Sequence, residues 1–347
     1  MKKILITGCA GFIGSHLAEY FIKEGSKVFG IDNLSRRGND VNLNLLMGYG
    51  TERFKFCKVD IIHFERVVDV YRDNGPFDLV IHQAAQVAVT NSIKNPREDL
   101  EINIIGTFNL LEATRKYSPD ALFQYASTNK VYGELSEICV VERKGQYDYE
   151  DLPGGVNENF NLDFHSPYGC SKGAADQYVR DYHRIYGLRT VVLRQSCIYG
   201  TRQFGIEDQG WVAWFVIAAM LGKPLTIYGD GKQGRDLLWI EDLVNAYVAL
   251  FENSEKIEGQ IFNVGGGSKN VLSLLGLVEL LRDRGLLELN LDFQNWRHGD
   301  QKIFVSDNNK ISTKIGWSPK VTPAEGVETL IRWVENNKPV ISKTLFS

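Results

Sequence analysis

Short, continuous apolar runs recur along the chain, and the segments between them have the spacing of amphipathic helices. The runs lie at residues 4–6, 28–31, 54–59, 78–81, 121–125 and 190–193. Strands that are buried on both faces of a sheet have such runs, and parallel strands joined by helices are the usual case. The pattern therefore predicts an α/β fold in which a doubly wound, mostly parallel sheet is covered by helices on both faces.

Three of the intervening helices have recognisable ends. One covers residues 12–22. A second runs from the capping residue Asn95, which Pro96 follows, to about residue 117. A third is capped by Ser166 and covers residues 168–186, with a glycine directly after it. We expect each of these helices to pack one apolar face against the sheet.

The regular alternation of strand and helix stops in two places. Residues 133–165 form a long, polar, Gly- and acid-rich connection, which is more typical of a functional flap than of a plain linker. After residue 194 the elements alternate less cleanly. We therefore predict a dinucleotide-binding domain from residues 1–194 plus about 236–264, and a smaller lobe from about 195–235 plus 265–347.

The first strand runs into a glycine-rich turn that opens the first helix. Gly8, Gly11 and Gly14 lack a Cβ, which permits a sharp bend, close approach of a pyrophosphate to the backbone, and tight packing of helix on sheet. The N–H groups of the new helix then face the phosphates. This strand–turn–helix context predicts a dinucleotide site.

An acidic residue follows the second apolar run, about twenty residues after the turn. Asp32 at this position can bind the hydroxyls of the adenosine ribose and repels a 2′-phosphate, so NAD is favoured over NADP. Arg36 and Arg37 lie nearby in the sequence and keep NADP open as an alternative.

Tyr168 and Lys172 stand four residues apart on one predicted helix, so both project from the same face. A phenol is a poor base at neutral pH, but a neighbouring ammonium favours the phenolate and draws the phenol pKa toward the working range. Thr128, at the end of the fifth strand, can hydrogen-bond and orient a substrate hydroxyl. These three residues are the predicted catalytic set.

The composition narrows the possible partners. With 44% hydrophobic residues the composition is ordinary for a soluble protein, and the net charge of −4 argues against general binding to nucleic acid or to a membrane surface. No apolar run approaches the ~18 residues of a membrane span. The five cysteines are scattered without Cys-x-x-Cys spacing. We expect a cytoplasmic protein with reduced thiols and no metal site.

Taken together, these motifs resemble the extended short-chain dehydrogenases/reductases that act as nucleotide-sugar epimerases and dehydratases, over nearly the whole chain. The matching stretches are 7–14, 32–33, 60–61, 84–85, 103–107, 131–133, 168–172, 229–236 and 263–266. The resemblance implies a Rossmann domain and a tightly bound NAD that is regenerated in each turnover. The implied cofactor-binding residues are Gly8, Gly11, Phe12, Ile13, Gly14, Asp32, Asn33, Asp60, Ile61, Ala84, Ala85, Gln86, Asn103 and Lys172.

The same resemblance implies that the partner is a nucleotide-diphosphate sugar. Arg235 stands where family members use an arginine against the diphosphate, and Arg297 and Asp300 match the later nucleotide-contacting pair. The planar guanidinium suits phosphate oxygens. The expected substrate-binding residues are Val89, Thr90, Thr128, Arg202, Gln203, Arg235, Arg297 and Asp300.

Stretches 127–133, 162–178, 202–204 and 208–211 resemble the branch of the family that inverts C2 of a CDP-linked hexose. No carbonyl acidifies that C–H bond, so the resemblance implies transient oxidation to a ketosugar, in which Tyr168 takes the hydroxyl proton, and hydride return to the other face. A 4-epimerase of another nucleotide sugar and, from a different class, a redox-silent dinucleotide-binding protein remain alternatives. We expect a homo-oligomer, either a dimer or a tetramer.

The two residues directly after Thr128 distinguish the expected epimerase from a dehydratase. The 4,6-dehydratases of the family place an Asp-Glu pair directly after the Thr, because elimination of water needs an extra acid and base. Here the two residues are Asn129 and Lys130, which cannot do this work in the same way. Elimination is therefore not expected, and Lys130 is equally compatible with a plain surface charge.

Overall fold

The computed structural model describes residues 1–286, 291–297 and 300–346. Its main element is a seven-stranded sheet with the strand order β12-β8-β5-β4-β1-β2-β3. Every neighbouring pair in this sheet is parallel, which confirms the predicted sheet type. The strands are β1 (Lys3–Thr7), β2 (Lys27–Asp32), β3 (Phe54–Lys58), β4 (Leu79–His82), β5 (Leu122–Thr128), β8 (Thr190–Gln195) and β12 (Gln260–Val264). The strand order reverses between β1 and β4, where such sheets bind ligands.

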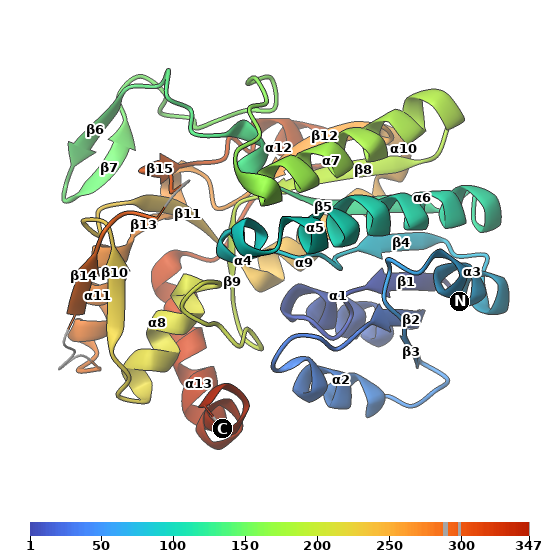
Figure 1. Ribbon diagram of the computed structural model, residues 1–347, viewed down its shortest axis with the longest axis horizontal. Helices are drawn as coiled ribbons and strands as arrows, with labels where there is room; N and C mark the ends of the chain where they lie inside the picture. Colours follow the sequence, from blue (N-terminus) through green and yellow to red (C-terminus); the bar gives the residue numbers. More distant parts are fainter. Residues whose placement is uncertain (287–290, 298–299, 347) are drawn as a thin grey trace.

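Helices cover both faces of the sheet (Figure 1). Ile4 and Ile6 of β1 belong to one apolar core and Leu5 to the other, because successive side chains of a strand point to opposite faces. The first core is closed by α1 (Phe12–Lys23), α2 (Asn39–Met47) and α9 (Ile240–Glu252). The second is closed by α3 (Phe64–Asn74), α6 (Gly106–Tyr117) and α7 (Ser166–Tyr186).

The helix predicted from Asn95 to about residue 117 is present from Pro96 to Tyr117, but it contains a π-helical turn and lacks the predicted Asn95 cap. The chain forms α4 (Val89–Lys94), α5 (Pro96–Leu100), a π-helical turn η1 (Glu101–Ile105) and then α6. Asn95 makes no capping bond; its amide donates to Asn91 Oδ1 at 3.1 Å. Asn103 lies in the π-helical turn, and its side chain is committed to partners outside the helix. Such turns often occur at functional sites.

The smaller lobe is built around a second, mixed sheet. Its central strand β11 pairs with β9, β13 and β15, and β10 pairs with β14 beside it. The strands are β9 (Cys197–Tyr199), β10 (Leu225–Tyr228), β11 (Gly234–Trp239), β13 (Val271–Ser273), β14 (Leu291–Gln294) and β15 (Ile303–Phe304). The helices of this lobe are α8 (Trp211–Met220), α11 (Leu274–Asp283), α12 (Asn309–Ile315) and α13 (Pro323–Phe346), whereas the short helix α10 (Ser254–Ile257) packs against α9 beside the large sheet. The division into two interleaved units stays a proposal, supported by β12 joining the large sheet.

The connection between residues 133 and 165 contains an antiparallel hairpin that the sequence analysis does not predict. Its strands are β6 (Val140–Arg143) and β7 (Gln146–Tyr149). Tyr147 fixes the hairpin to the smaller lobe, because its hydroxyl donates to Asp230 Oδ2 at 2.6 Å and its N–H to the Lys232 carbonyl at 2.9 Å. Figure 1 shows the hairpin beside β15 and β11. In the described part of the chain, no helix is long and apolar enough to cross a membrane.

Candidate active site

The glycine turn lies between the end of β1 and the start of α1, and its geometry excludes side chains. Gly8 has a φ of +67°, and a Cβ on it would lie 2.8 Å from the backbone nitrogen of Ala84. A Cβ on Gly14 would lie 2.0 Å from the Gly8 carbonyl oxygen, so the helix packs directly on the turn. The backbone is therefore exposed where a phosphate group can approach it.

Asp32 ends β2 and is held in place by its neighbours. Its carboxylate accepts hydrogen bonds from the N–H of Ala10 at 3.1 Å, the N–H of Leu34 at 2.8 Å and the amide of Asn39 at 3.1 Å. The side chain is buried, and burial raises the pKa of Asp32 despite these three donors. Asn33, the next residue, donates to Asp60 Oδ2 at 2.9 Å and so joins the ends of β2 and β3.

The turn and these acidic residues line one cleft of about 840 Å³, counting the space open to solvent. That volume is in the range of cofactor pockets. Most of the predicted cofactor residues line it, namely Gly8, Gly11, Phe12, Ile13, Gly14, Asp32, Asn33, Asp60, Ile61, Ala84 and Ala85. Ser35, Arg36, Asn39 and Gln209 also line this cleft, which we call the cofactor cleft, and the sequence analysis did not assign them to it.

Three of the predicted cofactor residues, Gln86, Asn103 and Lys172, do not line the cofactor cleft. The Asn103 side chain accepts from the Gln86 N–H at 2.9 Å and donates to the Ser171 hydroxyl at 3.0 Å. Ser171 in turn donates to the buried carboxylate of Asp99. This network ties the end of β4 to the first turns of α7. The sequence analysis gave neither Asp99 nor Ser171 a role, although Ser171 lies within the matching stretch 168–172.

The predicted catalytic residues lie together at the junction of β5 and α7. Thr128 is the last residue of β5, and its side chain lies near enough to the Tyr168 phenol to act on the pKa of that group. Burial raises the pKa of Tyr168, while the Thr128 side chain and the Arg36 charge oppose that rise. Lys172 lies one turn further along α7. Its Nζ donates to the Ala126 carbonyl at 2.5 Å, and burial lowers the pKa of Lys172 to about 7.

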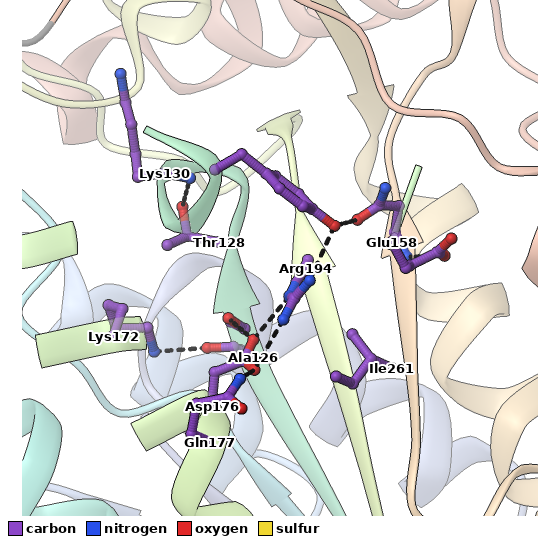
Figure 2. A network of polar contacts seen from close by, with 12 residues as sticks. Ala126, Thr128, Lys130, Glu158, Lys172, Asp176, Gln177, Arg194 and Ile261 are labelled. Atoms are coloured by element: carbon purple, nitrogen blue, oxygen red, sulfur yellow. Dashed lines mark hydrogen bonds and ion pairs between the residues drawn. The ribbon is translucent and has the colours of Figure 1, made fainter. Parts of the chain in front are cut away.

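A buried ion pair holds α7 against the sheet beneath these residues. Arg194 of β8 meets the Asp176 carboxylate through two hydrogen bonds of 3.0 and 3.1 Å. Figure 2 shows this pair next to Lys172 and Ala126, with Thr128 and Lys130 above. Ser127 also donates to Asp176 at 2.7 Å. The helix that carries Tyr168 and Lys172 is thus fixed to two strands by charged hydrogen bonds, which are stronger than neutral ones.

A second cleft, of about 770 Å³, lies in the smaller lobe, and we call it the substrate cleft. Arg235, Arg297 and Asp300 line it, and so does Lys130. Arg235 donates to the Gln301 carbonyl at 2.7 Å. Arg297 stacks over Tyr228, with 3.7 Å between guanidinium and ring centre. The cleft therefore contains several cations in a rigid setting, as recognition of phosphate requires.

The other predicted substrate residues lie elsewhere. Arg202 and Gln203 line a third cleft beside the cofactor cleft, together with Arg36 and Arg37. Arg202 is paired with Glu19 of α1, and its φ is +61°. Val89 and Thr90 form the start of α4, and among the described residues they line none of these three clefts. The structure therefore brings together only Arg235, Arg297 and Asp300 of the predicted substrate set, with Thr128 at the neighbouring catalytic cluster.

The parallel sheet, the glycine turn and the Thr-Tyr-Lys cluster define an enzyme of the extended short-chain dehydrogenase/reductase class. The chain belongs to the family whose model is described as GDP-mannose 4,6 dehydratase, which matches residues 5–330. It is 46% identical to CDP-paratose 2-epimerase of Salmonella typhi over 339 residues, or 96% of this chain and 99% of the relative. It is also 31% identical to a putative UDP-glucose 4-epimerase of Methanocaldococcus jannaschii, over 96% of this chain and 99% of that protein.

Solved structures share the fold. UDP-glucuronic acid 4-epimerase from Bacillus cereus, in complex with UDP-glucuronic acid and NAD, superposes with a TM-score of 0.83 at 32% identity. The match covers 96% of this chain and 99% of that one. UDP-glucose 4-epimerase from Thermotoga maritima, with UDP-glucose, gives a TM-score of 0.83 at 31% identity, over 97% of this chain and 99% of the other. The family predicted from the sequence motifs is confirmed.

Proposed function

We propose that this enzyme holds NAD in the cofactor cleft and inverts C2 of a CDP-linked hexose of the paratose/tyvelose type. The observation that carries the proposal is that Thr128 links the Tyr168 phenol to the wall of the substrate cleft. Its side chain acts on the pKa of Tyr168, and its hydroxyl accepts the N–H of Lys130, a residue that lines the substrate cleft. A sugar hydroxyl placed at Thr128 is therefore within reach of the phenol.

The residues of the cofactor cleft fit a dinucleotide. The strict need for glycine at positions 8 and 14 leaves bare backbone for a pyrophosphate, and the buried Asp32 carboxylate suits ribose hydroxyls. The crystal of the Bacillus cereus relative contains NAD, which supports the same cofactor here. NAD supplies reversible hydride acceptance at the sugar carbon.

The catalytic roles follow from the contacts. Thr128 orients the sugar hydroxyl, and Tyr168 takes its proton during oxidation and returns it during reduction. Because burial raises the pKa of Tyr168, the phenol needs a compensating positive charge to act as a base. Arg36 acts on the phenol in this way, and we propose that Lys172, one turn away on the same helix face, adds positive charge when it is protonated. The ketosugar then presents its other face, so reduction gives the epimer.

The residues of the substrate cleft support a proposal for how the nucleotide is held. We propose that Arg235 and Arg297 bind the diphosphate and that Asp300 binds the nucleotide, since all three line one cleft. The roles of Arg202, Gln203, Val89 and Thr90 in substrate binding stay predictions. Arg202 and Gln203 lie beside the cofactor cleft instead.

Two observations favour C2 inversion over the alternatives. The Salmonella typhi relative at 46% identity is a CDP-paratose 2-epimerase, and Asn129 and Lys130 lack the carboxylates that elimination of water would use. A 4-epimerase is the second candidate, supported by the UDP-sugar 4-epimerases among the relatives and structural neighbours. The two reactions differ in which sugar carbon faces the cofactor.

A panel of nucleotide sugars tests the proposal. The purified enzyme is incubated separately with CDP-paratose, CDP-glucose, UDP-glucose and UDP-glucuronic acid, and NMR identifies the inverted carbon. We expect inversion at C2 of the CDP sugar and none in the Tyr168→Phe control. Inversion at C4 of a UDP sugar, with no change of the CDP sugars, would replace the proposed activity by the second candidate.

We also propose that the enzyme is a homo-oligomer. Apolar side chains are exposed together on the outer face of α6 and α7, including Phe108, Tyr178 and Tyr186. The Phe108 and Tyr178 rings pack edge to face across the two helices, with 6.2 Å between their centres. Exposed apolar surface of this kind is typical of a contact between subunits. Light scattering of the wild type and of Phe108→Glu tests this expectation; a wild-type monomer would refute it.

A further inference from the structure

Lys130 enters the substrate cleft directly from the catalytic cluster. It lies on η2 (Asn129–Tyr132), the single turn that follows β5. Its N–H donates to Thr128 Oγ1 at 3.3 Å, whereas its side chain leads away from Thr128 and Lys172 (Figure 2). The side chain lines the cleft together with Arg235, and its Nζ lies 3.5 Å from Gln301 Oε1. Lys130 is therefore part of the cleft wall and not a plain surface charge.

Two cationic side chains, Lys130 and Arg235, repel each other in the wall of the substrate cleft. The charged or titratable groups that act on the Lys130 ammonium include Arg235, Asp300, Glu134 and Cys197. Burial and the neighbouring Arg235 lower the pKa of Lys130 to about 8. Two cations side by side in a partly desolvated cleft are unfavourable on their own, and an anion between them reverses the sign of the interaction.

We propose that Lys130 binds the diphosphate of the nucleotide sugar opposite Arg235. This inference rests on the proposed function, which places a nucleotide-diphosphate sugar in this cleft. Arg235 already uses two of its N–H groups on the carbonyls of Gly234 and Gln301, at 2.8 and 2.7 Å. A second cation therefore adds charge that the arginine alone does not supply. Because Lys130 is joined to Thr128 through its backbone, it also fixes the diphosphate relative to the residue that orients the sugar.

Equilibrium binding tests the inference without turnover. The NAD-loaded wild type and Lys130→Met are titrated calorimetrically with CDP, UDP, GDP, dTDP and with cytidine, which has no phosphate. We expect the variant to bind each diphosphate that the wild type binds about 10- to 100-fold more weakly, as for loss of one charged hydrogen bond. The affinity for cytidine should not change. Lys302→Met is the matched control, since Lys302 is exposed and lies outside the cleft lining.

The pH dependence separates a direct contact from a change in shape. Wild-type affinity for CDP should fall as the pH rises through about 8, because the Lys130 ammonium loses its proton there. Lys130→Arg should restore binding and remove this fall between pH 7 and 9.5, since arginine stays charged. Equal losses for CDP and cytidine in Lys130→Met, an unchanged CDP affinity, or no binding of any diphosphate by the wild type would each overturn the inference. Because no step needs catalysis, failure of C2 inversion in the sugar panel is a separate result.

Discussion

Replacing the buried Lys172 should make the protein more stable while it removes activity. The pKa of this lysine is lowered from 10.5 to about 7 by burial, and the side chain is only 4% exposed. At about 1.36 kcal/mol for each pH unit, this difference corresponds to a cost of about 5 kcal/mol for keeping the ammonium in the folded state at pH 7. Lys172→Met removes that cost.

Lost contacts offset part of the gain. The ammonium donates to the Ala126 carbonyl and lies 4.3 Å from the centre of the Tyr125 ring. A charged hydrogen bond contributes about 1.5–3 kcal/mol. We therefore expect Lys172→Met to raise the free energy of unfolding at pH 7 by about 2–3 kcal/mol. The control Lys269→Met replaces an exposed lysine and should change it little.

The sign of the pH dependence follows from the same pKa. Between about pH 7 and 10.5 the unfolded chain binds the extra proton and the folded chain does not, so the wild-type penalty shrinks as the pH rises. The advantage of Lys172→Met should be largest below pH 7 and decrease toward pH 10. This difference in the free energy of unfolding is measured by urea unfolding, followed by circular dichroism, after NAD has been removed from both proteins. A variant less stable than the wild type at pH 7, or a gain that is independent of pH, would refute this reasoning.

Three further changes have defined outcomes. Tyr168→Phe should lower kcat by about 10²–10⁴-fold and leave the amount of bound NAD unchanged. Turnover assays measure the first quantity and absorbance the second, and full activity would exclude the phenol as base. Asp32→Ala should release NAD during purification, because its carboxylate lies in the cofactor cleft; a full complement of NAD would count against that contact. Arg194→Met should cost about 3–5 kcal/mol in urea unfolding, since it leaves Asp176 buried and unpaired. Adding Asp176→Asn should recover part of the loss, and a further loss would contradict this account.

The strands of the large sheet could be predicted because burial on both faces demands continuous apolar runs. Residues 4–6 and 28–31 are such runs, and both lie within strands of the large sheet. The π-helical turn within the helix of residues 96–117 could not be predicted, because the side chain of Asn103 in that turn bonds Gln86 and Ser171, which are distant in sequence. Helix propensity depends on the local sequence and carries no information about such distant contacts.

The hairpin at residues 140–149 could not be predicted either, because its position also depends on contacts that are distant in the sequence. Its sequence is polar, and Tyr147 fixes it to Asp230 and Lys232, more than eighty residues further along the chain. In the candidate site, Gly8 and Thr128 could be placed together because parallel strands end at one edge of the sheet. The position of Arg202 could not, because it depends on an ion pair with Glu19 of α1.

The central claim is that one sugar carbon loses a hydride to the bound cofactor and regains it, while Tyr168, assisted by Lys172, takes and returns the hydroxyl proton. The most direct measurement is the reaction of the NAD-loaded enzyme with CDP-paratose in deuterated water, followed by NMR of the product. The account predicts inversion at C2 with no deuterium at that carbon, because the hydride that leaves is the one that returns. Deuterium at C2 would show exchange of that hydrogen with solvent and would contradict the account.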